Sequence, residues 1–162
     1  MKNKNISNEK MKIILEEISS PDGKYFGGVT AYLCAEFALA LLEKLNFRIA
    51  RKNDENSSFF LNSGKKASSL KEYSDHLASN DGDIFKKMFE LPQEEKNIFL
   101  KNVIIEQNKF LNEILLLQED IKKACSIIKG SVKEDYFMVD EILTSSYKNI
   151  NTIIKFEEKK IK

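Results

Sequence analysis

The chain has little of the chemistry on which many metal sites, catalytic triads and disulfide-bonded folds depend. It contains one histidine, two cysteines, two prolines and no tryptophan among 162 residues. The single histidine, His76, lies in a polar run without a second ligand at metal-binding spacing, which argues against zinc or a histidine-based triad. Cys34 and Cys125 both sit in helix-like sequence. We therefore expect a surface histidine, no metal, and two buried thiols in a reducing cytoplasm.

An excess of charge and a membrane-length apolar run are missing as well. The 26 basic and 25 acidic residues give a net charge of +1, too little to favour nucleic acid. The longest apolar run, Val29 to Leu42, contains Glu36 and is shorter than the roughly 20 residues that cross a bilayer. We expect no signal peptide, and the residues show neither a P-loop nor a dinucleotide fingerprint. We expect one cytoplasmic domain, residues 1–162, that binds neither nucleic acid nor membrane.

Apolar residues recur at helical spacing along most of the chain, and no segment shows the sustained alternation of a strand. The pattern predicts an all-α bundle of five to seven helices. A turn is expected at residues 80–83, where Asn-Asp-Gly-Asp follows a helical stretch. The expected helices cover about residues 11–18, 29–51, 65–78, 84–90, 93–129 and 133–158.

The expected helix from Gln93 to Lys129 contains no proline or glycine. A straight helix of that length would extend roughly 55 Å, more than a domain of this size easily covers by itself. Either the helix is kinked or a partner chain covers part of its apolar stripe. The second alternative would be met by a homodimer.

A glycine break, residues 20–28, opens directly onto the most apolar predicted helix. The join places bare backbone amides at the positive end of a buried helix, which suits an anionic ligand. Gly27 and Gly28 would let such a ligand approach the backbone closely. The alternative is an ordinary turn between two helices.

Three short motifs occur in the order typical of one family. The family marks its start with Ser-Pro-x-Pro-Gly-Gly-Gly-Ser, followed by a long helix of small residues, and the chain retains the two ends of that motif. The matching positions are Ser20-Pro21 and Gly27-Gly28, then Asp83-Ile84-Phe85 with Leu91-Pro92, then Gly130-Ser131, Glu134-Asp135 and Asn151. The second proline, one glycine and the serine of the first motif are missing. With these anchors, the chain resembles the folate cyclodeaminase/methenyltetrahydrofolate cyclohydrolase family, which includes the C-terminal domain of formiminotransferase-cyclodeaminase.

The resemblance implies a one-carbon enzyme with a tetrahydrofolate derivative as substrate and an active site near a dimer interface. Such enzymes close 5-formiminotetrahydrofolate with loss of ammonia, or open the methenyl ring with water. Both reactions need proton transfer at nitrogen, which a carboxylate can perform. Asp135 is the matching general acid/base and Asp83 the second catalytic candidate. Each carboxylate has a plainer interpretation, since acidic residues also favour helix starts and caps.

The resemblance also nominates residues that contact the folate. They are Pro21, Lys24, Gly27 and Gly28. Lys24 would pair with the glutamate carboxylates. The alternative is a catalytically inactive family member that acts as a folate- or protein-binding scaffold, or a helical interaction protein with accidental similarity. The arrangement in space discriminates between them, because an enzyme should gather Asp135, Asp83 and the two glycines around one cavity.

Overall fold

The chain is mostly helical in the part that the computed structural model describes, residues 11–23, 25, 27–52 and 55–162. This confirms the predicted all-α class, and the described residues contain five helices and no strand. The helices are α1 (Met11–Ser19), α2 (Gly27–Ala50), α3 (Ser57–Glu90), α4 (Gln93–Ile127) and α5 (Val132–Glu158).

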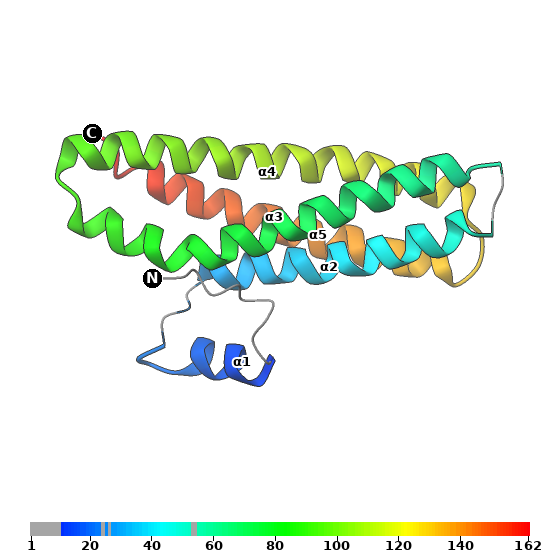
Figure 1. Cartoon of the computed structure of the whole chain (residues 1–162), viewed down its shortest axis with the longest axis horizontal. Coiled ribbons are helices and arrows are strands. Elements are labelled where there is room, and N and C mark those ends of the chain that lie inside the picture. Colours follow the sequence, from blue (N-terminus) through cyan, green and yellow to red (C-terminus); the bar gives the residue numbers. More distant parts are fainter. Residues whose placement is uncertain (1–10, 24, 26, 53–54) are drawn as a thin grey trace.

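Helices α2 to α5 form an up-and-down four-helix bundle (Figure 1). Helix α2 packs on α3 and α5, and α4 packs on the same two helices, so that each helix has two neighbours around one core. The antiparallel arrangement brings the start of one helix to the end of another. Tyr136 near the start of α5 donates a 2.8 Å hydrogen bond to Asn46 near the end of α2. Gln93 at the start of α4 donates one of 3.2 Å to the Lys160 carbonyl, just beyond α5.

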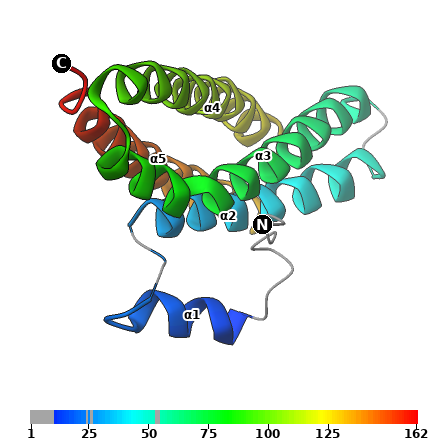
Figure 2. The same cartoon turned by 60° about the vertical axis from the view of Figure 1, so that its left-hand side comes forward.

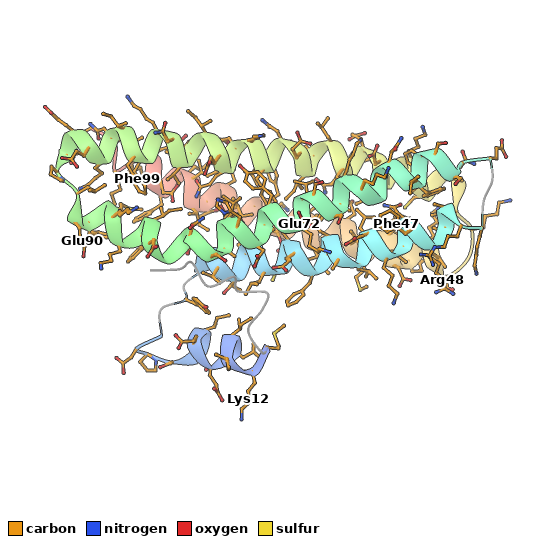
Figure 3. All side chains as sticks on the ribbon, in the orientation of Figure 1. Lys12, Phe47, Arg48, Glu72, Glu90 and Phe99 are labelled. Carbon is orange, nitrogen blue, oxygen red and sulfur yellow. The ribbon has the colours of Figure 1, made fainter. Side chains whose placement is uncertain are left out.

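The two ends of the bundle are formed by different helix ends. Figure 3 places Phe47 and Arg48 at the end where α2 finishes, and Glu90 and Phe99 at the end where α3 passes into α4. The chain's C-terminus lies at this second end, where Asn97 donates to the Lys162 carbonyl at 3.0 Å. The start of α2 lies toward the same end.

Helix α2 makes its most extensive contact with α3, and several of its buried residues are small. Ala31, Ala35 and Ala38 are at most 3% exposed, and they allow α3 to approach closely. Buried polar groups then fix the register. Asn46 of α2, which accepts from Tyr136 of α5, also donates to Ser63 of α3 at 3.1 Å. Since an unpaired buried polar atom costs about 1–3 kcal/mol, this network opposes any sliding of the three helices.

The turn predicted at residues 80–83 is wrong, because α3 continues through it as one helix. The segment's polar residues are typical of turns, and Gly82 inside a helix costs about 1 kcal/mol relative to alanine. Tertiary packing outweighs this preference. Leu77, Ala78 and Asp81 all face the bundle interior, with exposures of 3%, 1% and 8%. Of the residues that looked like a turn, Asp81 therefore lies on a packed helix face, whereas Asp83 is exposed.

The long helix predicted after Pro92 is confirmed as one element, α4, which ends at Ile127. Gly130 follows with a φ of 80°, in the left-handed region that favours glycine after a helix. The two helices that pack on α4, α3 and α5, do not cover it completely. Four of its apolar side chains are 45–67% exposed: Ile98, Ile105, Leu115 and Leu116.

Helix α1 lies beside the bundle rather than within it (Figures 1 and 2). Ile14 is its one buried residue among those described, while Met11 and Leu15 are 46% and 57% exposed. None of the described helices combines the length and the apolar character that a membrane span requires.

The expectation of two buried thiols is wrong for one of them. Cys125 is buried, but Cys34 is exposed, and both are free. The first half of α2 is apolar nearly all round, yet only α3 and α5 pack extensively against it. The outward line through Cys34 and Phe37, which is 51% exposed, is left uncovered. His76 is exposed, as predicted.

Candidate functional site

A pocket of about 350 Å³ opens at the end of the bundle where α2 begins. Its walls come from the first residues of α2, the last third of α3 and the last third of α5. Most of the lining is apolar, with two carboxylates among it. The lining residues are Gly27, Gly28, Asp81, Ile84, Phe85, Met88, Thr152, Ile153, Phe156 and Glu157.

Asp81 occupies the position that the sequence assigned to an anionic ligand. Its carboxylate accepts a hydrogen bond from the backbone N–H of Val29, at the positive end of α2. A Cβ added to Gly28 would overlap this carboxylate, so the glycine is what allows α3 to bring an acid against the helix start. Burial raises the pKa of Asp81 to about 6, and the Val29 hydrogen bond opposes that rise.

Glu157 is the least satisfied group in the pocket. The residue is only 2% exposed, and its Oε1 accepts a 3.3 Å hydrogen bond from Gln107 of α4. Its Oε2 is buried without a hydrogen-bond partner. Burial raises the pKa of Glu157 to about 7, the Gln107 hydrogen bond opposes the rise, and the Asp81 carboxylate adds to it.

The remaining two helices contribute polar groups to the same place. Tyr32 of α2 is 1% exposed, and its pKa is raised by burial and by the carboxylates of Asp81 and Glu157. The Gln107 side chain lies near the Tyr32 hydroxyl and favours its ionised form. Neither that hydroxyl nor Gln107 Oε1 has a partner in hydrogen-bonding geometry. We call Tyr32, Asp81, Gln107 and Glu157, one from each bundle helix, the acidic cluster.

Aromatic rings surround the acidic cluster on the pocket's outer side. Phe85 and Phe156 line the pocket and are 40% and 42% exposed. The Phe85 ring packs against Phe89, one turn further along α3, with 5.0 Å between ring centroids. The Lys160 ammonium lies 4.9 Å from the Phe156 centroid and 5.8 Å from that of Phe89. These rings therefore already attract a cation.

The pocket gathers some of the predicted site residues. Gly27 and Gly28 both line it, Gly28 buried and Gly27 exposed. Asp83 lies two residues beyond Asp81 on α3, exposed, and is not part of the lining. Pro21 is exposed in the segment before α2. The structure thus brings the two glycines together with an acid, but the acid is Asp81.

Asp135 is far from this pocket. It is half-buried in the first turn of α5, whereas the pocket is lined by the last turns of the same helix, from Thr152 onward. At 1.5 Å per residue this separation is about 25 Å along α5. Within one chain, Asp135 and the two glycines do not share a cavity. Lys24, the remaining predicted contact, lies outside the described residues.

The acidic cluster was missed because carboxylates and amides in amphipathic helices usually face solvent. The helical register contained the signal. Glu157 follows the stripe residue Ile154 by three positions, so it continues the apolar face of α5. Asp81 comes four positions after the buried Leu77 of α3. Gln107 comes at the same spacing after a buried apolar residue of α4. A polar residue at a core position predicts a buried, functional or paired group.

Comparisons of the chain with protein-family models, with curated proteins and with solved structures gave no match. The family resemblance therefore rests on the motif residues alone. In the described part of the chain, no group of three or more histidine, cysteine, aspartate or glutamate side chains could hold a metal ion.

Proposed function

We propose that this chain is a small-molecule-binding helical bundle and that the pocket at the start of α2 is its binding site. One observation carries the proposal: Glu157, 2% exposed, lines a largely apolar pocket with a carboxylate oxygen that has no partner. A buried polar atom left unpaired costs free energy, which a ligand with a hydrogen-bond donor would recover. A pocket of about 350 Å³ with a few convergent polar groups suits a small ligand.

Binding rather than catalysis is the function that the positions of the predicted residues favour. The enzyme interpretation requires Asp135, Asp83 and the two glycines around one cavity. Only the glycines line the pocket, while Asp83 is exposed outside it and Asp135 lies at the other end of α5. This supports the scaffold alternative within a single chain.

A one-carbon folate enzyme is the second candidate, and one observation favours it. Gly27 and Gly28, the two glycines that the resemblance nominates, line the same pocket as a buried carboxylate. A carboxylate can accept two parallel N–H donors, such as the amino edge of a pterin. In this case Glu157, with its pKa raised to about 7, replaces Asp135 as the candidate general acid/base.

The folate candidate also includes a homodimer, because the resemblance places the active site near a dimer interface. The exposed apolar side chains of α4, Ile98 and Ile105 among them, are available for such an interface. Sedimentation equilibrium of the purified chain tests this part. A monomer at all concentrations would remove the dimer, and with it any site that needs residues from two chains.

Titration calorimetry tests the binding function with three probes: 2-phenylethylammonium, 2-phenylethanol and tetrahydrofolate. A Cβ added at Gly27 meets no atom within 4 Å beyond its chain neighbours and the backbone of its own helix, so Gly27→Leu can begin a larger apolar side chain at the pocket wall. Gly27→Ala is the matched control. At least one probe should bind saturably, and Gly27→Leu should abolish that binding while Gly27→Ala retains it. Absence of binding by all three probes, or binding unaffected by Gly27→Leu, would refute the proposal.

The same samples test the folate candidate. With 5,10-methenyltetrahydrofolate as probe, the methenyl absorbance is followed during the titration. Turnover that Glu157→Gln abolishes would support a one-carbon enzyme, whereas saturable binding without change in absorbance would support a folate-binding scaffold.

A further inference from the structure

The pocket has a chemical character that narrows its ligand class. Two carboxylates, Asp81 and Glu157, line it, and the described residues of its wall include no basic side chain. Apolar and aromatic side chains make up most of the remaining wall, and the nearby ammonium of Lys160 lies over two phenylalanine rings. Acidic groups inside and aromatic rings at the edge are a combination that attracts organic cations.

We propose that the pocket binds a small organic cation, an ammonium group carried on an apolar body, with the ammonium directed at Glu157 Oε2 and the body between Phe85 and Phe156. This inference rests on the proposed function and names its ligand class. The ammonium would supply donors to the oxygen that now has none. The apolar body would cover the side chains of Ile84, Met88 and Ile153.

The two carboxylates have different tasks in this arrangement. Asp81 is already engaged, because its carboxylate accepts from the Val29 amide at the start of α2. Glu157 keeps one oxygen on Gln107 and presents the other without a partner. Glu157 is therefore the recognition group, and Asp81 adds negative charge behind it.

An anionic ligand fits the same walls poorly. It would place a charge of the same sign beside Glu157 and Asp81, in surroundings too apolar to screen the repulsion. A neutral ligand of the same shape would gain the apolar contacts but not the charge-assisted hydrogen bond.

Removing the charge of Lys160 provides a second, independent test of the ligand's charge. Its ammonium sits 4.9 Å from the Phe156 ring and competes with any cation that approaches the same aromatic face. Lys160→Gln removes this charge, so an ammonium ligand should bind more tightly to the variant. A folate, whose glutamate carboxylates would benefit from the lysine, should bind more weakly.

Binding should also follow the ionisation of Glu157. Among the described residues, the groups that face this carboxylate are Tyr32 from α2, Asp81 from α3 and Gln107 from α4, and none of these three is a cation. With a pKa near 7, about a tenth of Glu157 is ionised at pH 6 and about nine-tenths at pH 8. The affinity for an ammonium ligand should rise about 10-fold between these two pH values.

Calorimetry with two ligands of nearly identical shape tests the inference. 2-Phenylethylammonium should bind at least about 10-fold more tightly than 2-phenylethanol at pH 8, because only the former makes a charge-assisted contact. Glu157→Gln should remove that preference, while Glu158→Gln, which removes the same charge from the exposed neighbouring residue, should retain it. Lys160→Gln should tighten ammonium binding about 2–5-fold.

The failure of the inference differs from the failure of the proposed function. If Gly27→Leu blocks 2-phenylethanol or tetrahydrofolate while 2-phenylethylammonium has no advantage, the pocket binds ligands but does not recognise cations. If the ammonium preference survives Glu157→Gln, or if Lys160→Gln weakens ammonium binding, the assigned contact is wrong. Thermal melts of each variant verify folding before titration.

Discussion

Replacing Glu157 by glutamine should make the protein more stable at pH 8 and change its stability by less than about 1 kcal/mol near pH 5. The folded protein raises the pKa of this carboxyl from 4.5 to about 7, chiefly by burial. Between those pH values the folded chain holds a proton that the unfolded chain has released. The free energy of unfolding of the wild type therefore falls as pH rises through this window.

The size of the effect follows from the two pKa values. Each pH unit between 4.5 and about 7 contributes about 1.4 kcal/mol, so full ionisation of Glu157 costs the fold about 3 kcal/mol. Glutamine keeps the shape of the side chain without the charge. At pH 8 the Glu157→Gln variant should gain about 3 kcal/mol over the wild type. In a domain of this size that corresponds to a rise in Tm of about 6–12 °C.

Urea denaturation followed by circular dichroism, at half-unit steps from pH 5 to pH 8.5, measures this directly. The difference between variant and wild type cancels the contributions of titrating groups that lie far from Glu157. Glu158→Gln, exposed and adjacent, is the matched control and should follow the wild-type pH profile. Parallel profiles for Glu157→Gln and wild type would show that Glu157 ionises as it does in solvent, and would refute the reasoning.

Two more predictions concern the start and the outer face of α2. Gly28→Ala should lower the free energy of unfolding by about 1–3 kcal/mol, because its Cβ would push Asp81 away from the amide at the helix start. Gly27→Ala is the control. Its Cβ meets open space, so the same urea titration should show a change of less than about 0.5 kcal/mol. Mass spectrometry after brief treatment with a thiol reagent should find Cys34 modified in the folded protein, and Cys125 modified only when urea is present.

Most of the fold was predictable from the sequence. Helical spacing predicted the class, and the uninterrupted run after Pro92 predicted α4 as one helix. The prediction from sequence failed at residues 80–83, where the local preference for a turn competes with packing that only the folded bundle provides. It failed at Cys34 for a related reason, since an apolar helix does not indicate which of its sides the neighbouring helices will cover.

The site was only partly accessible to sequence reasoning. The glycines at the start of α2 line a pocket, and the carboxylate found beside them is Asp81 of the chain itself. Convergence of Tyr32, Gln107 and Glu157 depends on how four helices are aligned along the bundle axis. Periodicity within each helix identifies its buried face. It does not specify which residues of two different helices lie at the same height along the bundle axis.

The most direct measurement is a map of amide chemical-shift changes in the ¹⁵N-labelled protein titrated with 2-phenylethylammonium at pH 8. The account predicts that the largest changes fall on residues of the pocket, including Gly27, Gly28 and Thr152, and that the amides around Asp135 at the other end of α5 do not move. Changes centred on Asp135, or no saturable changes at all with this probe, would contradict the account of the pocket as a site for organic cations.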